Sequence, residues 1–197
     1  MSESKKVASL IGLRDVVYCL IEEDSSEKTT YGPVQKLVGA VSMSIGEQNS
    51  DPDVQYCDDG EFDAVYPDPE FSGDLTLADL PPAQAAVILG AALDQNGVLI
   101  RRGGDKPPYI ALGFKSLKAN NVDRYVWLYK GRGTIKNEDY ATKKGADITR
   151  QNAKINMTFV KRLSDGAWKA MVDTDEPQFE AMKDTFFTAP YTPNLAQ

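Results

Sequence analysis

Alternation of apolar and polar residues with a period of two is the feature that most constrains the fold of this chain. In residues 37–45, 71–77, 110–115 and 155–159, every second residue is apolar or glycine. Successive side chains of a β-strand point to opposite faces, so each segment predicts a strand with one buried face. Residues 15–21 are apolar at almost every position, which favours a strand covered on both faces. The chain is therefore expected to be rich in β-structure.

Turn-forming residues connect these segments into hairpins. The turns are expected at residues 94–97, 119–123 and 164–166, which contain the Asp, Asn, Ser and Gly residues typical of tight turns. Further strands are expected to follow them, over residues 98–100, 124–130 and 168–172. We see no internal repeat.

One internal helix is expected between Asp79 and Gly90. Asp79 is a suitable N-cap, the two prolines that follow Leu80 fit the first turn, and Gly90 can end the helix in the left-handed conformation. Leu80, Ala83 and Val87 share one face, which we expect to cover an open side of a sheet.

These elements predict a mainly β fold, a β-sandwich or barrel of about eight antiparallel strands with one short flanking helix. Its core is expected to contain nine side chains: Val17, Val41, Ile45, Leu77, Leu112, Phe114, Trp127, Phe159 and Trp168. The expected organisation is an N-terminal arm over residues 1–13, the sandwich domain over residues 14–173 with a long loop at 46–69, and a helix with an extended tail over residues 174–197.

Two of the segments outside the sandwich carry their own signals. The loop 46–69 is strongly acidic, and structureless loops of about 20 residues are uncommon in compact domains, so it is expected to have a function or to form strands itself. After residue 174, Asp175 can cap a helix and Pro177 suits its first turn. Three apolar residues then recur at helical spacing: Phe179, Met182 and Phe186.

The composition excludes several kinds of chemistry. The 197 residues include no histidine, so Ser-His-Asp catalysis and histidine-ligated metals are ruled out. The two cysteines, Cys19 and Cys57, lie too far apart for a C-x-x-C site. A net charge of −7 opposes the binding of nucleic acid phosphates. We expect no enzyme activity, no cofactor, no export signal and no membrane anchor.

Three sequence clusters have a functional and a plainer interpretation. The acidic residues 51–63 lack the calcium-loop spacing, because Tyr56 stands where the loop requires glycine. Residues 101–105 lack the phosphate-loop pattern and are expected to form a turn. Tyr125, Trp127 and Tyr129 could stack on bases, but aromatic residues at every second position also suit ordinary sheet packing, which we favour. An exposed sheet edge and unburied arms favour assembly with a partner.

Six segments, in order, carry a resemblance to a known family: residues 12–18 (GLRDVVY), 77–81 (LADLP), 96–99 (NGVL), 108–115 (PYIALGFK), 125–131 (YVWLYKG) and 165–169 (DGAWK). Taken together, they resemble the major tail protein, or tail tube protein, of long-tailed, non-contractile bacteriophages of the type common in phages and prophages of Gram-positive bacteria. The resemblance runs from about residue 10 to residue 187. It does not cover residues 188–197.

The resemblance implies a virion structural protein. Its subunits would form hexameric rings that stack into a hollow tail tube for genome passage. The implied partners are further copies of the chain, the tape measure protein, and the tail terminator and tail tip proteins, while double-stranded DNA would pass without being bound. The protein would be made in the host bacterial cytoplasm and reside in the virion tail.

The charge and the arms give that implication a mechanism. Six subunits of −7 give −42 per ring, and a negatively lined bore would repel DNA. Family members are thought to use a long loop between early strands to reach the adjacent ring. Residues expected at contacts between subunits or rings are Glu47, Asp51, Asp53, Tyr56, Asp58, Asp59, Glu61, Phe62, Phe179, Met182 and Phe186.

Other functions stay open. Within the same structural class, the chain could be the tube protein of a contractile tail or of a type VI-like secretion system. From a different class, it could be an acidic β-sandwich ligand-binding module or a carboxylate-based hydrolase, which an apolar pocket with convergent polar groups would favour.

Overall fold

The computed structural model describes residues 7–48, 51–57, 60–65, 67–142 and 150–193. It confirms a mainly β fold with a large antiparallel sheet and one short α-helix. In chain order the elements are β1 (Leu10–Asp24), β2 (Thr29–Tyr31), β3 (Gln35–Lys36), β4 (Ala40–Gln48), β5 (Asp53–Cys57), β6 (Gly60–Val65), β7 (Glu70–Leu77), α1 (Pro82–Leu89), β8 (Ala92–Leu93), β9 (Leu99–Ile100), β10 (Ile110–Lys118), β11 (Asp123–Asn137), β12 (Ala153–Phe159), β13 (Lys169–Asp173) and the 3-10 helix Pro177–Met182.

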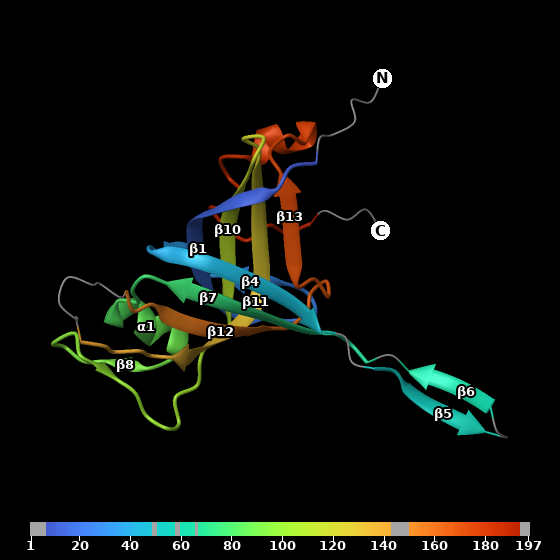
Figure 1. The fold of residues 1–197 in the computed structure, drawn as a ribbon, viewed down its shortest axis with the longest axis horizontal. Helices are drawn as coiled ribbons and strands as arrows, with labels where there is room; N and C mark the ends of the chain where they lie inside the picture. Colours follow the sequence, from blue (N-terminus) through green and yellow to red (C-terminus); the bar gives the residue numbers. More distant parts are fainter. Residues whose placement is uncertain (1–6, 49–50, 58–59, 66, 143–149, 194–197) are drawn as a thin grey trace.

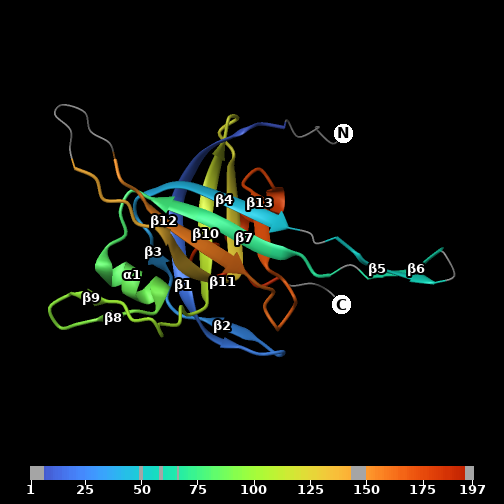
Figure 2. The same cartoon turned by 60° about the horizontal axis from the view of Figure 1, so that its bottom comes forward.

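The main sheet folds over itself because β11 belongs to both of its halves. The strand order is β2-β1-β10-β11-β12-β7-β4, with β13 and β3 attached to β11 and β1. The first part of β11 pairs with β13, and its last part pairs with β12. Strands β12, β7 and β4 therefore cross the face of β1, β10 and β11 as a second layer (Figures 1 and 2).

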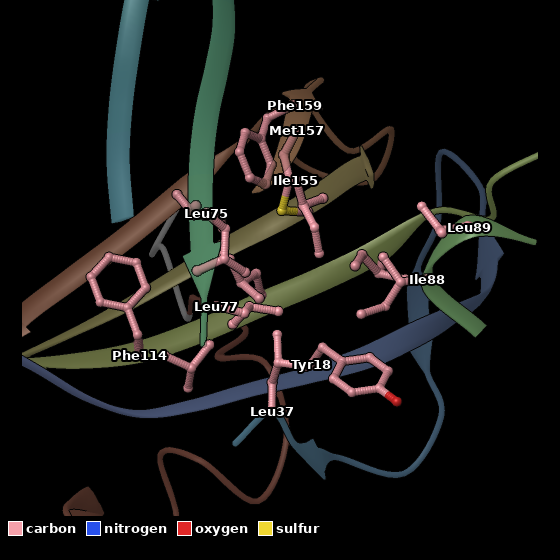
Figure 3. Close-up of a cluster of buried hydrophobic side chains, with 14 of the residues drawn as sticks. Tyr18, Leu37, Leu75, Leu77, Ile88, Leu89, Phe114, Ile155, Met157 and Phe159 are labelled. Carbon is pink, nitrogen blue, oxygen red and sulfur yellow. The ribbon is translucent and has the colours of Figure 1, made fainter. Parts of the chain in front are cut away.

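The first buried cluster lies between these two layers and is closed at one end by α1 (Figure 3). Strand β7 shows why the alternation predicts burial, since Phe71, Leu75 and Leu77 are buried whereas Ser72 is exposed. Facing residues come from β1, β10 and β11, the neighbouring strand β12 adds Ile155, Met157 and Phe159, and α1 adds Ile88 and Leu89 to the cluster.

A second buried cluster lies on the opposite face of β1, β10 and β11. Residues Val16 to Cys19 are all buried, with alternate side chains in the two clusters, as expected for a strand covered on both faces. The cover on this second face is the C-terminal segment, which contributes Phe179 and Phe186. The protein therefore has three layers rather than the two of a plain sandwich.

Helix α1 ends as predicted but buries a different face. Gly90 closes it in the left-handed conformation, with φ of 65°. The helix begins at Pro82 with Pro81 as N-cap, so Asp79 is not the cap. Its buried residues are Ala85, Ala86, Ile88 and Leu89, whereas Ala83 is exposed and Leu80 and Val87 are only partly buried.

The predicted core is wrong at Val41, whose side chain is 54% exposed. Residues 37–45 do not form one strand, because a turn at Gly39, with φ of 90°, separates Leu37 from β4. Within β4, a bulge between Ala40 and Ser42 reverses the alternation at Val41. Ile45 is partly buried against the first cluster.

The other predicted core residues lie inside the protein, in different places. Leu77, Leu112, Phe114 and Phe159 belong to the first cluster. Val17 and Trp127 belong to the second cluster. Trp168 is only partly buried and stacks on Phe71 at the edge of the first cluster, with the ring centroids 4.0 Å apart.

The predicted boundaries also change. Strand β1 begins at Leu10, so residues 10–13 belong to the sheet rather than to an arm. The loop 46–69 is in part a β-hairpin formed by β5 and β6. The C-terminal helix expected from Phe179, Met182 and Phe186 is a short 3-10 helix followed by turns, because its apolar residues wrap onto the sheet instead of lining one face of an α-helix.

Candidate assembly surfaces

Strands β5 and β6 form an acidic arm, which we define as residues 49–69. Among the described residues, the two strands pair with each other and with no other strand. Figures 1 and 2 show that they project away from the body, beyond the ends of β4 and β7. An isolated two-stranded hairpin is marginally stable in water, so the pairing of β5 with β6 stabilises the arm only weakly.

The charges of the chain are segregated between this arm and the rest. Residues 47–70 contain nine of the 29 acidic residues and none of the 22 basic ones. The remaining chain therefore has 20 acidic and 22 basic residues. The net charge of −7 thus arises from the arm together with Glu47 and Glu70 beside it, whereas the body is slightly positive.

The described side chains of the arm face solvent. Phe62 is 72% exposed and Val65 is 60% exposed, so the arm presents large apolar side chains beside its acidic ones. Glu47, Asp51 and Asp53 are also exposed. The side chains of Tyr56, Asp58, Asp59 and Glu61 lie outside the described residues.

An ion pair fixes the base of the arm to the body. Lys161 contacts Asp68 at 2.7 Å between Nζ and Oδ1. Both side chains are largely exposed, so this pair adds little to the free energy of unfolding.

Strands β4 and β13 of the main sheet each keep an open edge in the described part of the chain. Strand β4 pairs only with β7, and β13 pairs only with β11. An open edge presents backbone N–H and C=O groups that can pair with another chain. Both edges are therefore candidate contacts between subunits.

A groove lies between the first residues of β1 and strand β4, at the open end of the sandwich. It has a volume of about 430 Å³. Its floor is apolar, with Phe114 and Val126 buried and Met43 partly buried, and Met171 at its rim is 59% exposed. Its lining residues are Leu10, Gly12, Leu13, Val41, Ser42, Met43, Ile45, Phe114, Ser116, Arg124, Val126, Lys169 and Met171.

The groove has a basic rim. Lys169 is partly exposed, and its Nζ lies 5.6 Å from the centroid of the Trp168 ring. Among the described residues, no carboxylate lies within ion-pair distance of Lys169. Arg124, the second cation of the groove, is bound to Asp173 through two hydrogen bonds of 2.7 and 3.0 Å.

Asp173 also accepts a hydrogen bond from Lys118, so two cations share one carboxylate. The hydrogen bonds from Arg124, and next from Lys118, lower the pKa of Asp173 to about 2, although partial burial opposes the shift. Since Asp173 ends β13 and its partners lie on β10 and β11, this cluster holds three strands together.

The C-terminal contact candidates pack inside the single chain. Phe179 and Phe186 are 2% and 6% exposed, and Met182 is partly buried beside them. The ring of Tyr125 meets Phe179 edge-on, at 5.3 Å between centroids. These apolar residues satisfy one another within the chain, because the outer face of the sheet offers them aromatic partners.

A buried arginine was not anticipated from the sequence. Arg162 is 2% exposed, and its guanidinium binds both carboxylate oxygens of Asp165 and lies 3.7 Å from the centroid of the Tyr129 ring. Its Nη1 donates to the hydroxyl of Tyr31 at 3.2 Å. The contacts with Asp165, Tyr31 and Tyr129 hold the Arg162 guanidinium in place and fix the turn before β13.

The clusters that could carry other chemistry follow their plainer interpretation. The backbone N–H of Arg102 donates to the Asp105 carboxylate at 2.7 Å, which forms a turn. Tyr125, Trp127 and Tyr129 are at most 5% exposed and cannot stack on bases as placed. In the described part of the chain, no three potential metal ligands come together, and no helix is long and apolar enough to cross a membrane.

A second cleft of about 400 Å³ lies between α1 and the ends of β11 and β12. Its floor contains Leu80, Ala85 and Ile155, and Asp79, Glu138 and Lys154 lie among its lining residues. None of these three charged side chains is buried. Among its described lining residues, the cleft shows no convergent buried polar groups of the kind that a catalytic pocket needs.

Comparison with known proteins gives no match, either among protein-family models or among curated proteins.

Proposed function

We propose that this chain is the tail tube subunit of a long-tailed, non-contractile bacteriophage, which forms hexameric rings that stack into a hollow tube. The observation that carries the proposal is the acidic arm, a hairpin that leaves the body and exposes Phe62 and Val65. Such a hairpin is poorly stabilised alone, so a neighbouring subunit is the natural source of its missing contacts.

The open edges of the sheet support the same function. Edges of β4 and β13 that pair with neighbouring subunits would close a ring and remove these two open edges of the sheet. The arm would then join one ring to the next. The order of the six tail-protein-like segments in the sequence adds the specific class of assembly.

Charge segregation limits where a negative bore could come from. Because the body without residues 47–70 carries two more basic than acidic residues, its net charge cannot line the tube negatively. A bore that repels DNA would require the arms, or an uneven distribution of body charges, at its wall.

Deletion of the arm tests the proposal. Gln48 and Glu70 are register partners across β4 and β7, so residues 49–69 can be replaced by an Asn-Gly turn that joins two paired strands. We expect the variant to remain folded, with an unfolding free energy within about 1 kcal/mol of the wild type, since little of the body contacts the arm. We expect it to stay monomeric where the wild type forms tubes. Normal tubes from this variant would reject the role of the arm.

A further inference from the structure

We propose that the groove between β1 and β4 receives the acidic arm of a second copy of this chain. This inference rests on the proposed function, because it names the receiving surface for the contact between rings. Both surfaces are incomplete in the single chain: the arm exposes Phe62 and Val65, and the groove exposes Val41 and Met171.

Charge complementarity favours this occupant over others. Every charged side chain of the arm is negative, and Asp53 and Asp63 are exposed on it. Lys169 at the groove has no carboxylate partner among the described residues, and Arg124 lines the same groove. An acidic hairpin would supply that partner while its apolar residues cover the floor of the groove. Rim charges of this kind mainly direct association and fix register.

The position of the two surfaces makes the contact one between copies. Residues 41–43 and Ile45 of β4 line the groove, whereas the arm leaves β4 after Gln48 and points away from the body (Figure 1). A contact between two different surfaces of identical chains is heterologous, and it leaves a free arm and a free groove at the ends of each row. Repetition of this contact therefore extends the assembly along one axis into a filament.

Cross-linking in the full-length protein tests the contact directly. Cys57 lies on the arm and is exposed, whereas Cys19 is buried, and burial raises its pKa to about 12, so Cys57 is the reactive native thiol. We would introduce Met171→Cys in the groove and treat assembled protein with a short bismaleimide. Leu163→Cys is the matched control, because Leu163 is 63% exposed but lies outside the groove.

We expect a ladder of cross-linked dimers and higher species with Met171→Cys, and only background cross-linking with Leu163→Cys. Assembled protein that cross-links through Leu163→Cys but not through Met171→Cys would overturn the groove assignment and leave the proposed function intact. A wild-type chain that never assembles would overturn the proposed function, and this inference with it.

A charge swap gives an independent measurement. Lys169→Glu should raise the protein concentration needed for assembly about fivefold, since it replaces an attraction by a repulsion. Asp63→Lys combined with Lys169→Glu should restore assembly, because every arm then meets a reversed groove. Lys183→Glu, an exposed reversal outside the groove, should have no effect. Wild-type assembly by Lys169→Glu alone, or no recovery in the double variant, would contradict the inference.

Discussion

The indole Nε1 of Trp127 donates a 2.8 Å hydrogen bond to the backbone carbonyl of Phe186. Trp127 lies in the first half of β11 and is fully buried, whereas Phe186 belongs to the C-terminal segment 59 residues later. This bond joins the central strand of the sheet to the segment that covers its outer face. The C-terminal segment is therefore part of the folded body and not a free arm.

Replacement of the two tryptophans should have unequal effects. Trp127→Phe leaves a smaller ring and an unpaired buried carbonyl, so we expect a loss of about 2 to 4 kcal/mol in the unfolding free energy. Trp168→Phe keeps an aromatic ring against Phe71 at a partly buried site and should cost about 1 kcal/mol. Urea denaturation monitored by circular dichroism measures both. Equal losses would contradict the placement of the two side chains.

Removal of residues 176–197 should expose the outer face of the sheet. Val17, Tyr125 and Trp127 would lose their cover, so we expect strong binding of the dye ANS and a lower melting temperature than in the full chain. A truncated protein with the wild-type melting temperature and no dye binding would show that the segment does not cover the sheet.

Acid should remove the contribution of Asp173. Its pKa in the folded protein is about 2, below the ordinary 3.8, so its stabilising effect is present above pH 3.8 and is lost as the pH falls toward 2. Asp173→Asn should therefore lower the unfolding free energy by about 1 kcal/mol or more at pH 7, and the difference from wild type should shrink below pH 3.8. Urea midpoints across this range give the measurement.

Asp175→Asn, at an exposed neighbouring position, serves as the control for that series. A difference between Asp173→Asn and wild type that persists unchanged at pH 2 would show that the charge of Asp173 is not responsible.

Two glycines with positive φ should differ in their tolerance of alanine. At Gly90, with φ of 65°, an added Cβ would lie 2.2 Å from the carbonyl oxygen of Lys106, so backbone must move. At Gly97, with φ of 79°, nothing lies within 4 Å of that position. We expect Gly97→Ala to cost about 1 kcal/mol and Gly90→Ala about 3 kcal/mol or more. Similar melting temperatures for the two variants would contradict the close approach of residue 106 to α1.

The alternation of residues was sufficient to predict strands, since it reports directly on which side chains face the core. It failed where a local irregularity changed the phase: a bulge reversed the pattern at Val41, and no residue type announces a bulge reliably. The surface against which the C-terminal segment packs could not be predicted from the sequence either. The spacing of Phe179 and Phe186 predicts apolar contacts, but it cannot say whether the sheet of the same chain or another subunit supplies them.

The assembly surfaces were predictable only in part. The acidity of residues 46–69 is visible in the sequence, and the alternative that this loop forms strands follows from its length. The groove was not predictable, because its lining comes from β1, β4, β10, β11 and β13, which only the folded chain brings together. Lys169 can be recognised as a cation without a carboxylate partner only when the folded chain shows that Asp173 binds Arg124 instead.

The central claim is that this chain assembles with its own copies, and electron microscopy of the purified full-length protein over a range of concentrations tests it most directly. We predict rings or tubes of uniform width with a hollow centre, appearing as the concentration rises and matched by large species in sedimentation velocity. A single monomeric species at every concentration, with no ring or tube in the micrographs, would contradict the account.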